Sequence, residues 1–558
     1  MTSLDPDALP AAGRSRAEDP EPGEGLILSG VEVEGGSTDV PLGAVAPLEP
    51  GALSRGLRRI LFGSAVFFGS TVLINASKVL LIPVYTRYLS PGQYGILGIA
   101  NALAGLLSTV LLLGLHGAVV REYYDYRDDP ASLRSYLSTV FIFLGILDVT
   151  VVAGLFLIGP GLATRFFPGS PVGFYPYLAL ALLIAAGTTF LGVSMALLQA
   201  QQRVVAYASI QLSRFGLLVG MTLVLLIWFH RGAEAPLWAD LFAILVTLVG
   251  VGWLLLRDDL WRLPKAAPRP DDVSAETASG PVVGGGAQSR AELFSSAKLK
   301  AALAYGIPLV PHQLSSWTLS VSDRLILAKY RPVEEVGTYV LGYSLAMGLN
   351  IVVGALNFAY VPFFLDLAKT HPRAKEVFAL VARAYVGVVG GVCLLGMLFA
   401  RELLAIIAPP TYARGAGILV IVLLAFFFLG LYLIVVLPFY HAKRTRYLPM
   451  FSGLAAAGNL GLNLILVPKY GATAAAYTTL AAYVVLFLTV AIVASRFYPI
   501  DYRLGRFWGF ICLVTATGLT LHAQPWEIRA LALGIFVLLA AFSGRRDWVE
   551  LKMLRAVS

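Results

Sequence analysis

Long apolar runs recur along almost the whole of this sequence, and they constrain its fold more than any other feature. The first begins near Ile60 and the last ends near Phe542. Each is close to the roughly 20 residues that a helix needs to cross a hydrocarbon core of about 30 Å. Hydrophobic residues make up 58% of the 558-residue chain and charged residues only 13%, whereas about a quarter of a soluble domain is charged. The sequence therefore predicts an all-α polytopic membrane protein.

We predict about 14 transmembrane helices. They begin near Ile60, Tyr94, Tyr136, Phe174, Ala206, Leu237, Ala302, Gly337, Phe378, Ala416, Tyr447, Gly471, Phe507 and Glu527. If the N-terminus is cytoplasmic, most Lys and Arg residues fall in the connections on the inner side, which satisfies the positive-inside rule. Both termini are therefore predicted to be cytoplasmic.

The order of these helices divides the chain into five parts. Residues 1–50 are rich in Asp, Glu, Gly and Pro, which is typical of a disordered acidic tail. The Pro/Gly/Ser-rich residues 257–300 form a predicted flexible linker on the cytoplasmic side, between six spans in 51–256 and six more in 301–496. The remaining two spans and the C-terminus lie in 497–558.

The two halves of the chain carry an internal duplication. At one constant offset, RYLSPGQYG (87–95) falls on KYRPVEEVG (329–337), and LQAQQR (198–203) falls on YHAKRT (440–445). An even number of spans separates the copies, so both copies have the same orientation and form a parallel repeat about an axis along the membrane normal. We predict two pseudo-symmetric six-helix lobes facing a central cavity, with the last two helices appended. The repeated polar stretch turns the chain outside the membrane, with Tyr88 and Tyr94 at the interface.

Polar side chains within the spans gather on particular helix faces. Such groups are costly in a bilayer and usually face a bundle interior or a water-filled path. In spans one and seven they recur at helical spacing, and the offset places Thr71 on Gln313 and Lys78 on Ser320. Spans two and eight carry Asn101, Ser108, Asn350 and Asn357. We predict that these four helices line the cavity through Thr71, Asn75, Lys78, Asn101, Ser108, Gln313, Ser316, Ser320, Asn350 and Asn357.

Charged residues within the spans have competing interpretations. Lys78 and Arg214 each lie about two turns from a helix end, where snorkelling explains them as well as a cavity role does. Asp148 lies near the middle of span three, where snorkelling is difficult, so a proton-linked or substrate-linked role is favoured. Asp323 and Arg324 either pair with neighbours at a helix end or have separate roles, in which Asp323, like Asp148, couples transport to an ion gradient. Asn459 and Asn463 in span eleven are expected to form interhelical hydrogen bonds.

The sequence offers no catalytic centre. It contains no phosphate-binding glycine loop with its lysine, no nucleophile constellation and no metal motif, so no catalytic residue, metal or cofactor is expected. Cys393 and Cys512 both fall within apolar runs. The positive-inside rule accounts for the basic charge, so no nucleic-acid partner is expected.

Three stretches carry a resemblance to a known family: LLIPVYTRYLSPGQYGILG, SVSDRLILAKYRPVEEVGTYVLGYSLA and LLQAQQR. Through these stretches, the part of the chain from residue 60 to residue 498 resembles a polysaccharide or O-antigen flippase. Such proteins are lipid-linked oligosaccharide flippases of the multidrug/oligosaccharidyl-lipid/polysaccharide exporter superfamily. The resemblance implies that a polyprenyl-diphosphate-linked oligosaccharide passes from the cytoplasmic to the outer leaflet by alternating access. It also implies a cationic cavity, for which Lys78, Arg214 and Arg324 are candidates.

This resemblance sets the expected partners and location. The chain is expected in a bacterial inner membrane, serving cell-surface or exopolysaccharide biosynthesis (O-antigen of lipopolysaccharide, for example), with membrane lipids around it and a glycan polymerase or assembly protein as a further partner. The alternatives are a cation-coupled drug exporter or lipid II flippase of the same superfamily, a membrane glycan polymerase or glycosyltransferase, and a non-transporting scaffold. A polymerase should carry a large external loop with catalytic groups, and the predicted external connections are all short.

Overall fold

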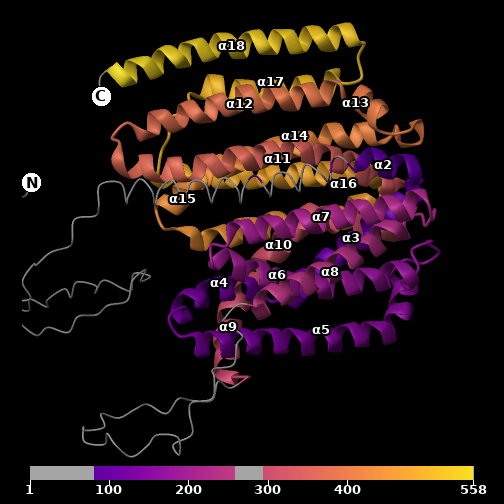
Figure 1. Cartoon of the computed structure of the whole chain (residues 1–558). Coiled ribbons are helices and arrows are strands. Elements are labelled where there is room, and N and C mark those ends of the chain that lie inside the picture. Colours follow the sequence, from indigo (N-terminus) through magenta and orange to yellow (C-terminus); the bar gives the residue numbers. More distant parts are fainter. Residues whose placement is uncertain (1–68, 70–78, 80, 258–292, 557–558) are drawn as a thin grey trace, which may run out of the picture. The chain divides into compact units, whose positions relative to one another are not determined.

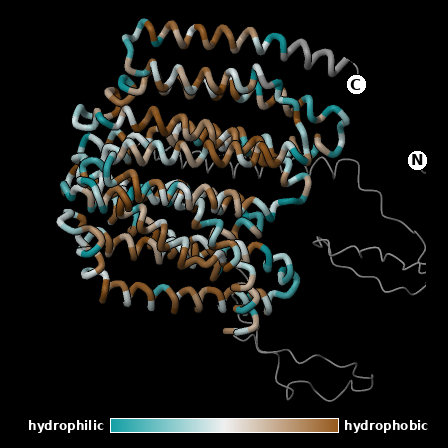
Figure 2. Tube along the Cα trace, turned by 180° about the vertical axis from the view of Figure 1, so that it is seen from behind, coloured by the Kyte–Doolittle hydropathy of each residue, from teal (hydrophilic) through white to brown (hydrophobic). Residues whose placement is uncertain are grey.

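The computed structural model describes residues 69, 79, 81–257 and 293–556, and within these ranges the chain is helical without strands. Ten of the described helices are long and apolar enough to cross a membrane. Apolar residues run along the helices and polar residues collect at their ends (Figure 2). The all-α polytopic fold is confirmed. The first predicted span lies almost wholly outside the described residues, so the count of fourteen stays a prediction.

Helices correspond to each of the other predicted spans (Figure 1). The N-terminal half contains α2 (Ile82–Tyr88), α3 (Pro91–Leu112), α4 (Leu115–Tyr126), α5 (Pro130–Phe166), α6 (Ala179–Ala200), α7 (Val204–Ile227) and α8 (Glu234–Arg257). The C-terminal half contains α9 (Ser296–Gly306), α10 (Val310–Tyr330), α11 (Val333–Thr370), α12 (Ala374–Leu398), α13 (Ala400–Ile407), α14 (Gly415–Val435), α15 (Leu437–His441), α16 (Leu448–Phe497), α17 (Leu504–Leu521) and α18 (Trp526–Ala556). Predicted spans eleven and twelve are the two parts of α16, which change direction at Gly471 (φ 63°).

The stretch SPGQ starts α3 by satisfying the free amides of its first turn. Ser90 Oγ accepts a hydrogen bond from the Gln93 amide (3.3 Å), and Gln93 Oε1 accepts one from the Ser90 amide (3.1 Å). Pro91 occupies the first turn, where its missing N–H costs nothing. Tyr88 is exposed as predicted, but Tyr94 is only 5% exposed because it packs against Tyr412 with ring centroids 6.2 Å apart. The side chain of Tyr94 therefore packs within the protein, and its position at the membrane interface stays a prediction.

Helices α3 and α11 cross in a reciprocal contact at the duplicated stretch. A Cβ added to Gly95 would overlap the carbonyl oxygen of Val333, and one added to Gly337 would overlap that of Pro91. The sequence offset relates Gly95 to Gly337 and Pro91 to Val333. Each repeat therefore presents the same atoms to the other, as a two-fold axis requires.

A second pair of similar contacts precedes the last helix of each repeat. Gly232 (φ 57°) lies against the side chain of Gln93, and Gly471 (φ 63°) lies against that of Glu335, which the offset relates to Gln93. Glu335 also accepts a hydrogen bond from the Ala472 amide at 2.7 Å. Both glycines adopt the left-handed backbone region, which other residues rarely enter. The two repeats thus use a similar contact before the corresponding helix, although the offset places Gly232 on Ala474, three residues after Gly471.

The buried core lies mainly in α3, α6, α11, α12, α14 and α16, and a smaller cluster joins α4, α5 and α6 with a few residues of α8 and α9. Helix α9 begins at Ser296, within the predicted linker 257–300, and packs against α4 and α5. Asp129 starts α5 by accepting hydrogen bonds from the Ala131 and Ser132 amides, both at 3.1 Å. Hydrogen bonding from Ser132 lowers the pKa of this carboxyl group.

The two appended helices α17 and α18 pack against α12 (Figure 1). Arg529 of α18 is only 6% exposed and donates hydrogen bonds to Glu402 of α13 at 2.5 and 2.9 Å and to the Leu398 carbonyl oxygen at 2.6 Å. These hydrogen bonds lower the pKa of Glu402. These contacts therefore attach the two C-terminal helices to the second repeat.

Candidate functional site

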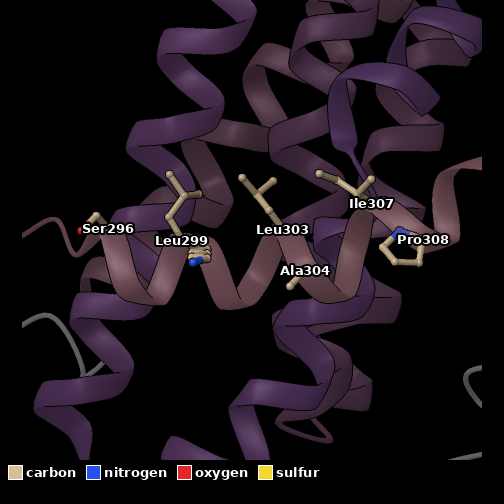
Figure 3. A pocket seen from close by; sticks show the side chains of 7 residues that line it. Ser296, Leu299, Leu303, Ala304, Ile307 and Pro308 are labelled. Atoms are coloured by element: carbon tan, nitrogen blue, oxygen red, sulfur yellow. The ribbon is translucent and has the colours of Figure 1, made fainter.

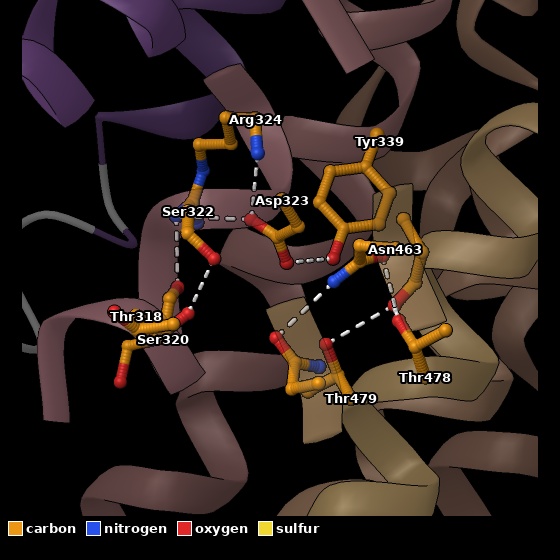
Figure 4. A network of polar contacts seen from close by, with 11 residues as sticks. Thr318, Ser320, Ser322, Asp323, Arg324, Tyr339, Asn463, Thr478 and Thr479 are labelled. Carbon is orange, nitrogen blue, oxygen red and sulfur yellow. Dashed lines mark hydrogen bonds and ion pairs between the residues drawn. The ribbon is translucent and has the colours of Figure 1, made fainter. Parts of the chain in front are cut away.

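Buried polar side chains of α10, α11 and α16 lie close together (Figure 4), in one hydrogen-bonded group on α10 and α11 and another within α16. Asp323 and Arg324 lie at the centre of the first group and are 1% and 8% exposed. Tyr339 donates a hydrogen bond to one carboxylate oxygen of Asp323, and the Arg324 amide donates to the other at 2.8 Å. Burying a carboxylate is expensive unless such donors replace water. We call the residues Ser320, Asp323, Arg324, Tyr339, Tyr343, Asn459, Asn463 and Thr478 the C-terminal polar network.

The Arg324 guanidinium group is held from two sides. Its Nη1 donates to the Ser320 carbonyl oxygen at 2.9 Å and lies 3.9 Å from the Asp323 carboxylate. Its Cζ lies 4.5 Å from the centre of the Tyr343 ring, within the range of a cation–π interaction. The buried cation is thus balanced by a carboxylate, a carbonyl oxygen and an aromatic face.

Amides and hydroxyls of α16 complete this network. Asn463 Nδ2 donates to Asn459 Oδ1 at 3.1 Å, and Thr478 Oγ1 donates to Asn463 Oδ1 at 2.7 Å. Asn463 and Thr478 lie on opposite sides of the bend at Gly471, so the predicted interhelical hydrogen bonding is confirmed for Asn463, whereas Asn459 is hydrogen-bonded only to Asn463 on its own span. Asn459 Nδ2 is buried and has no hydrogen-bond partner among the described residues. Figure 4 shows Asn463 facing Tyr339 across the network.

Helical spacing explains why these side chains converge. Tyr339 and Tyr343 are four residues apart on α11, as are Asn459 and Asn463 on α16, so each pair lies on one helix face. Helix α10 packs extensively against α16 and also contacts α11. A carboxylate, a cation, two phenols and two amides therefore meet, and this set can bind or release a proton or a small cation when the charge balance changes.

In the N-terminal repeat, Asp148 and Arg214 lie in two separate helix pairs. Asp148 on α5 is 3% exposed and accepts a hydrogen bond from Thr189 of α6 at 2.5 Å. The other carboxylate oxygen of Asp148 has no partner within the described part of the chain. On α7, Arg214 forms a half-buried ion pair with Asp240 of α8 at 3.0 Å. Asp148 and Arg214, which were predicted to differ in depth, therefore have different surroundings: Asp148 is buried beside a hydroxyl group, and Arg214 is half-buried in an ion pair.

The structure brings the predicted cavity-lining helices together in part. Helix α3 contacts both α10 and α11, and these helices carry Asn101, Ser108, Gln313, Ser316, Ser320, Asn350 and Asn357. Asn101 and Ser316 are exposed, whereas the others are half-buried. Arg324 and Asp323 turn into the C-terminal polar network, and Arg214 and Asp148 belong to other helix pairs. Thr71, Asn75 and Lys78 lie outside the described residues, so their predicted position on a face that lines the cavity stays a prediction.

Two of the pockets on the described part of the molecule lie away from the contact of α3 with α10 and α11. One, of about 490 Å³, lies along α9, where Leu299, Leu303 and Ile307 share a face (Figure 3). The other, of about 340 Å³, lies between the end of α11 and the start of α12. The central cavity therefore stays a prediction. Among the described residues, no group of three or more His, Cys, Asp or Glu side chains could hold a metal ion.

Sequence reasoning missed four side chains that contact the candidate residues. Tyr339 and Tyr343 hold the buried charges, Asp240 pairs with Arg214, and Thr189 pairs with Asp148. The complementary charges of adjacent predicted spans five and six could have revealed the Arg214 pair. The tyrosine pair lies within one of the stretches that carry the family resemblance, but its spacing alone does not distinguish it from packing.

Comparisons with known proteins agree with this fold. A family described as "Polysaccharide biosynthesis protein" matches residues 60–368. The Lsg locus putative protein 1 of Haemophilus influenzae is 25% identical over 312 residues, which cover 56% of this chain and 67% of that protein. The solved structure of the lipid II flippase MurJ in an inward closed conformation is 12% identical and has a TM-score of 0.57. That match covers 86% of this chain and 100% of the flippase, and at this identity the likeness is one of fold.

Proposed function

This chain belongs to the polysaccharide biosynthesis protein family, and from that premise we propose that it flips a polyprenyl-diphosphate-linked oligosaccharide from the cytoplasmic to the outer leaflet. The match to residues 60–368, which runs from the first repeat into the second, carries the proposal. The family and the fold are those of membrane transporters, so the chain is a multi-pass membrane transporter and not an enzyme. We place it in a bacterial inner membrane with both termini in the cytoplasm, because that orientation satisfies the positive-inside rule.

The chemistry of the cargo explains what the protein has to supply. A glycan bearing a diphosphate cannot cross hydrocarbon unaided, whereas its polyprenyl chain can remain in the lipid. Side chains of α3, α10 and α11 would replace water around the glycan: Asn101, Ser108, Gln313, Ser316, Ser320, Asn350 and Asn357, with Thr71 and Asn75 of the first span. Lys78, Arg214 and Arg324 would balance the phosphates, and Arg324 would first have to leave the Tyr343 ring.

Alternating access requires that contacts between the repeats open in turn. At the start of α3, Gly95 meets Gly337, and Thr86 Oγ1 donates to the Ile407 carbonyl oxygen at 3.1 Å. Towards the other end, Gly114 meets Gly306, and Arg121 lies over the Tyr305 ring at 5.2 Å. In the proposed cycle these two contact sets separate alternately.

A disulfide across the first contact set tests this cycle. Thr86→Cys combined with Ile407→Cys, in a Cys512→Ser background, should cross-link under oxidation and stop transport, and a reductant should restore it. Either single cysteine variant is the control. Full transport by a fully cross-linked protein would exclude opening at this end.

Two carboxylates are candidates for coupling to an ion gradient. Asp148 has a carboxylate oxygen without a partner among the described residues, which favours it as a proton acceptor. Asp323 is balanced by Arg324 and Tyr339, so any ion that it binds must displace one of them. A glycan polymerase or assembly protein is a proposed partner on the cytoplasmic segments.

Transport by the purified protein in vesicles is the decisive experiment. Labelled polyprenyl-diphosphate oligosaccharide should become accessible in the opposite leaflet, and protein-free vesicles should show no such movement. Lipid II and a cationic dye, offered in parallel, decide between this cargo and the two rival cargoes of the superfamily. If the labelled glycan-lipid does not move, or is polymerised, the proposal is wrong.

A further inference from the structure

The pocket between α11 and α12 is built mainly from basic and hydroxyl side chains. Its volume is about 340 Å³, and its lining includes Lys369, Thr370, His371, Lys375 and Tyr498. These residues come from three places: the end of α11, the start of α12 and the chain that leaves α16. No Asp or Glu residue lines the pocket. The cavity is therefore suited to an anion.

His371 lines this cavity, and its second ring nitrogen is available as a donor. Its Nδ1 accepts a hydrogen bond from the Arg373 amide at 3.1 Å. A ring nitrogen that accepts leaves the proton of the neutral imidazole on Nε2, so Nε2 is a hydrogen-bond donor. Lys369 and Lys375 are exposed and line the same cavity, so three side chains that carry donors border one space.

Aromatic rings fix the floor of the pocket. The Lys375 ammonium group lies 4.9 Å from the centre of the Tyr498 ring. That ring also packs against His441 at 5.4 Å and Phe364 at 6.2 Å, and Phe364 is fully buried. Tyr498 is thus packed on two sides beside the cavity. The basic side chains therefore surround a partly apolar surface, as expected for a group that is charged at one end and apolar at the other.

We propose that this pocket, the α11–α12 basic pocket, binds the phosphate group of a membrane lipid at the end of α11 that is predicted to be cytoplasmic. Lys ammonium and imidazole N–H groups form short, charge-assisted hydrogen bonds to phosphate oxygens. Basic pockets between helices on the cytoplasmic side bind anionic headgroups in this way. The phosphate comes from an anionic phospholipid or from the diphosphate of the cargo, and only the second source depends on the proposed function.

Lipid binding to the purified full-length protein tests the pocket without requiring transport. Native mass spectrometry would follow the titration of phosphatidylglycerol and, separately, of polyprenyl diphosphate, with phosphatidylcholine as the reference lipid. The double variant Lys369→Gln/Lys375→Gln should weaken binding of the responsible lipid by at least about tenfold, because two charge-assisted hydrogen bonds are lost. The Lys369→Arg/Lys375→Arg variant should retain most of the binding.

A matched double variant, Lys329→Gln/Lys469→Gln, removes two exposed lysines near the opposite end of α11 and should bind as the unaltered protein does. Loss of binding with phosphatidylglycerol identifies a phospholipid site, and loss with polyprenyl diphosphate identifies a cargo site; either supports the pocket. Unchanged binding of both lipids, or equal loss in the matched variant, overturns it. A protein that binds polyprenyl diphosphate here but moves no glycan in vesicles would retain the pocket and lose the proposed function.

Discussion

The two repeats share a backbone arrangement but not a polar interior. Both contribute the same glycine and carbonyl to the crossing of α3 and α11. Yet the offset that relates these glycines places Asp323 on Leu81, Arg324 on Ile82 and Tyr339 on Leu97. All three of these apolar residues are buried, with exposures of 5%, 2% and 4%. The same fold is therefore built with leucine and isoleucine where the second repeat has charges.

The converse holds for the polar pair of the first repeat. The offset places Asp148 on Gly390 and Thr189 on Leu431, so this hydrogen-bonded pair has no equivalent in the second repeat. Buried charges cost free energy that apolar residues of similar volume would not. Each repeat folds without the polar groups that the other repeat contains. These groups are therefore better explained by transport than by stability.

Replacing Asp323 with its counterpart leucine should have the largest effect. Asp323→Leu leaves Arg324 buried without its carboxylate, so the protein should lose about 3–5 kcal/mol of stability, and transport should stop. Thermal unfolding in detergent would measure the first effect and vesicle transport the second.

The triple variant Asp323→Leu/Arg324→Ile/Tyr339→Phe is the control for this result. It removes both charges and the phenol, so most of the lost stability should return while transport stays absent. If the triple variant transports normally, the polar network has no role in the cycle.

The second largest effect is expected at the crossing of α3 and α11, which both repeats form. Gly337→Ala introduces a Cβ that would overlap the backbone of α3, which cannot relax as a side chain can, so we expect a loss of about 2–3 kcal/mol. Gly348→Ala on the same helix meets nothing within 4 Å and should be neutral. Unfolding midpoints of the two variants make the comparison, and equal midpoints would mean that the repeats do not meet at Gly337.

A smaller effect is expected where the appended helices are fixed to the second repeat. Glu402→Gln weakens the hydrogen bonds to Arg529 and should cost about 1 kcal/mol at neutral pH, because the carboxylate is half-exposed. Since the pKa of Glu402 is lowered in the folded protein, its contribution is present above the usual glutamate range and is lost as the pH falls through the folded pKa.

The difference in unfolding midpoint between the Glu402→Gln variant and the unaltered protein should therefore shrink between pH 7 and about pH 4. Glu376→Gln, at an exposed position on α12, should show no such difference at either pH. A difference that grows in acid would contradict the ion pair.

The smallest effect on stability is expected in the first repeat. Asp148→Asn keeps an acceptor for Thr189, so stability should change by less than about 1 kcal/mol. The variant should instead lose the response of transport to collapse of the proton gradient. Thr189→Val, which removes the donor but keeps the carboxylate, should retain that response. An Asp148→Asn protein with full transport and an unaltered response would remove Asp148 from the coupling mechanism.

Most of the fold could be predicted from the sequence because it depends on local patterns. Apolar length places a helix whether or not its neighbours are known, so the predicted starts near Phe174, Ala416 and Gly471 agree with η1 (Phe174–Leu178), α14 and the bend of α16. The candidate site was harder to predict. Helical spacing predicted the helix face on which Ser320 and Asn350 lie. No local sequence pattern could show that Tyr339 would donate a hydrogen bond to Asp323.

The sequence by itself determined the membrane helices, their duplication and the polar connection that both repeats use at their crossing. Only the tertiary structure decided which polar groups meet: Asp148 with Thr189, Arg214 with Asp240, and Asn463 with Thr478. The physical reason is that helical periodicity fixes the face on which a side chain lies, whereas its partner depends on how separate helices pack against one another. In a bilayer that packing is set by close glycine contacts and hydrogen bonds, and these form only after the spans have been laid side by side.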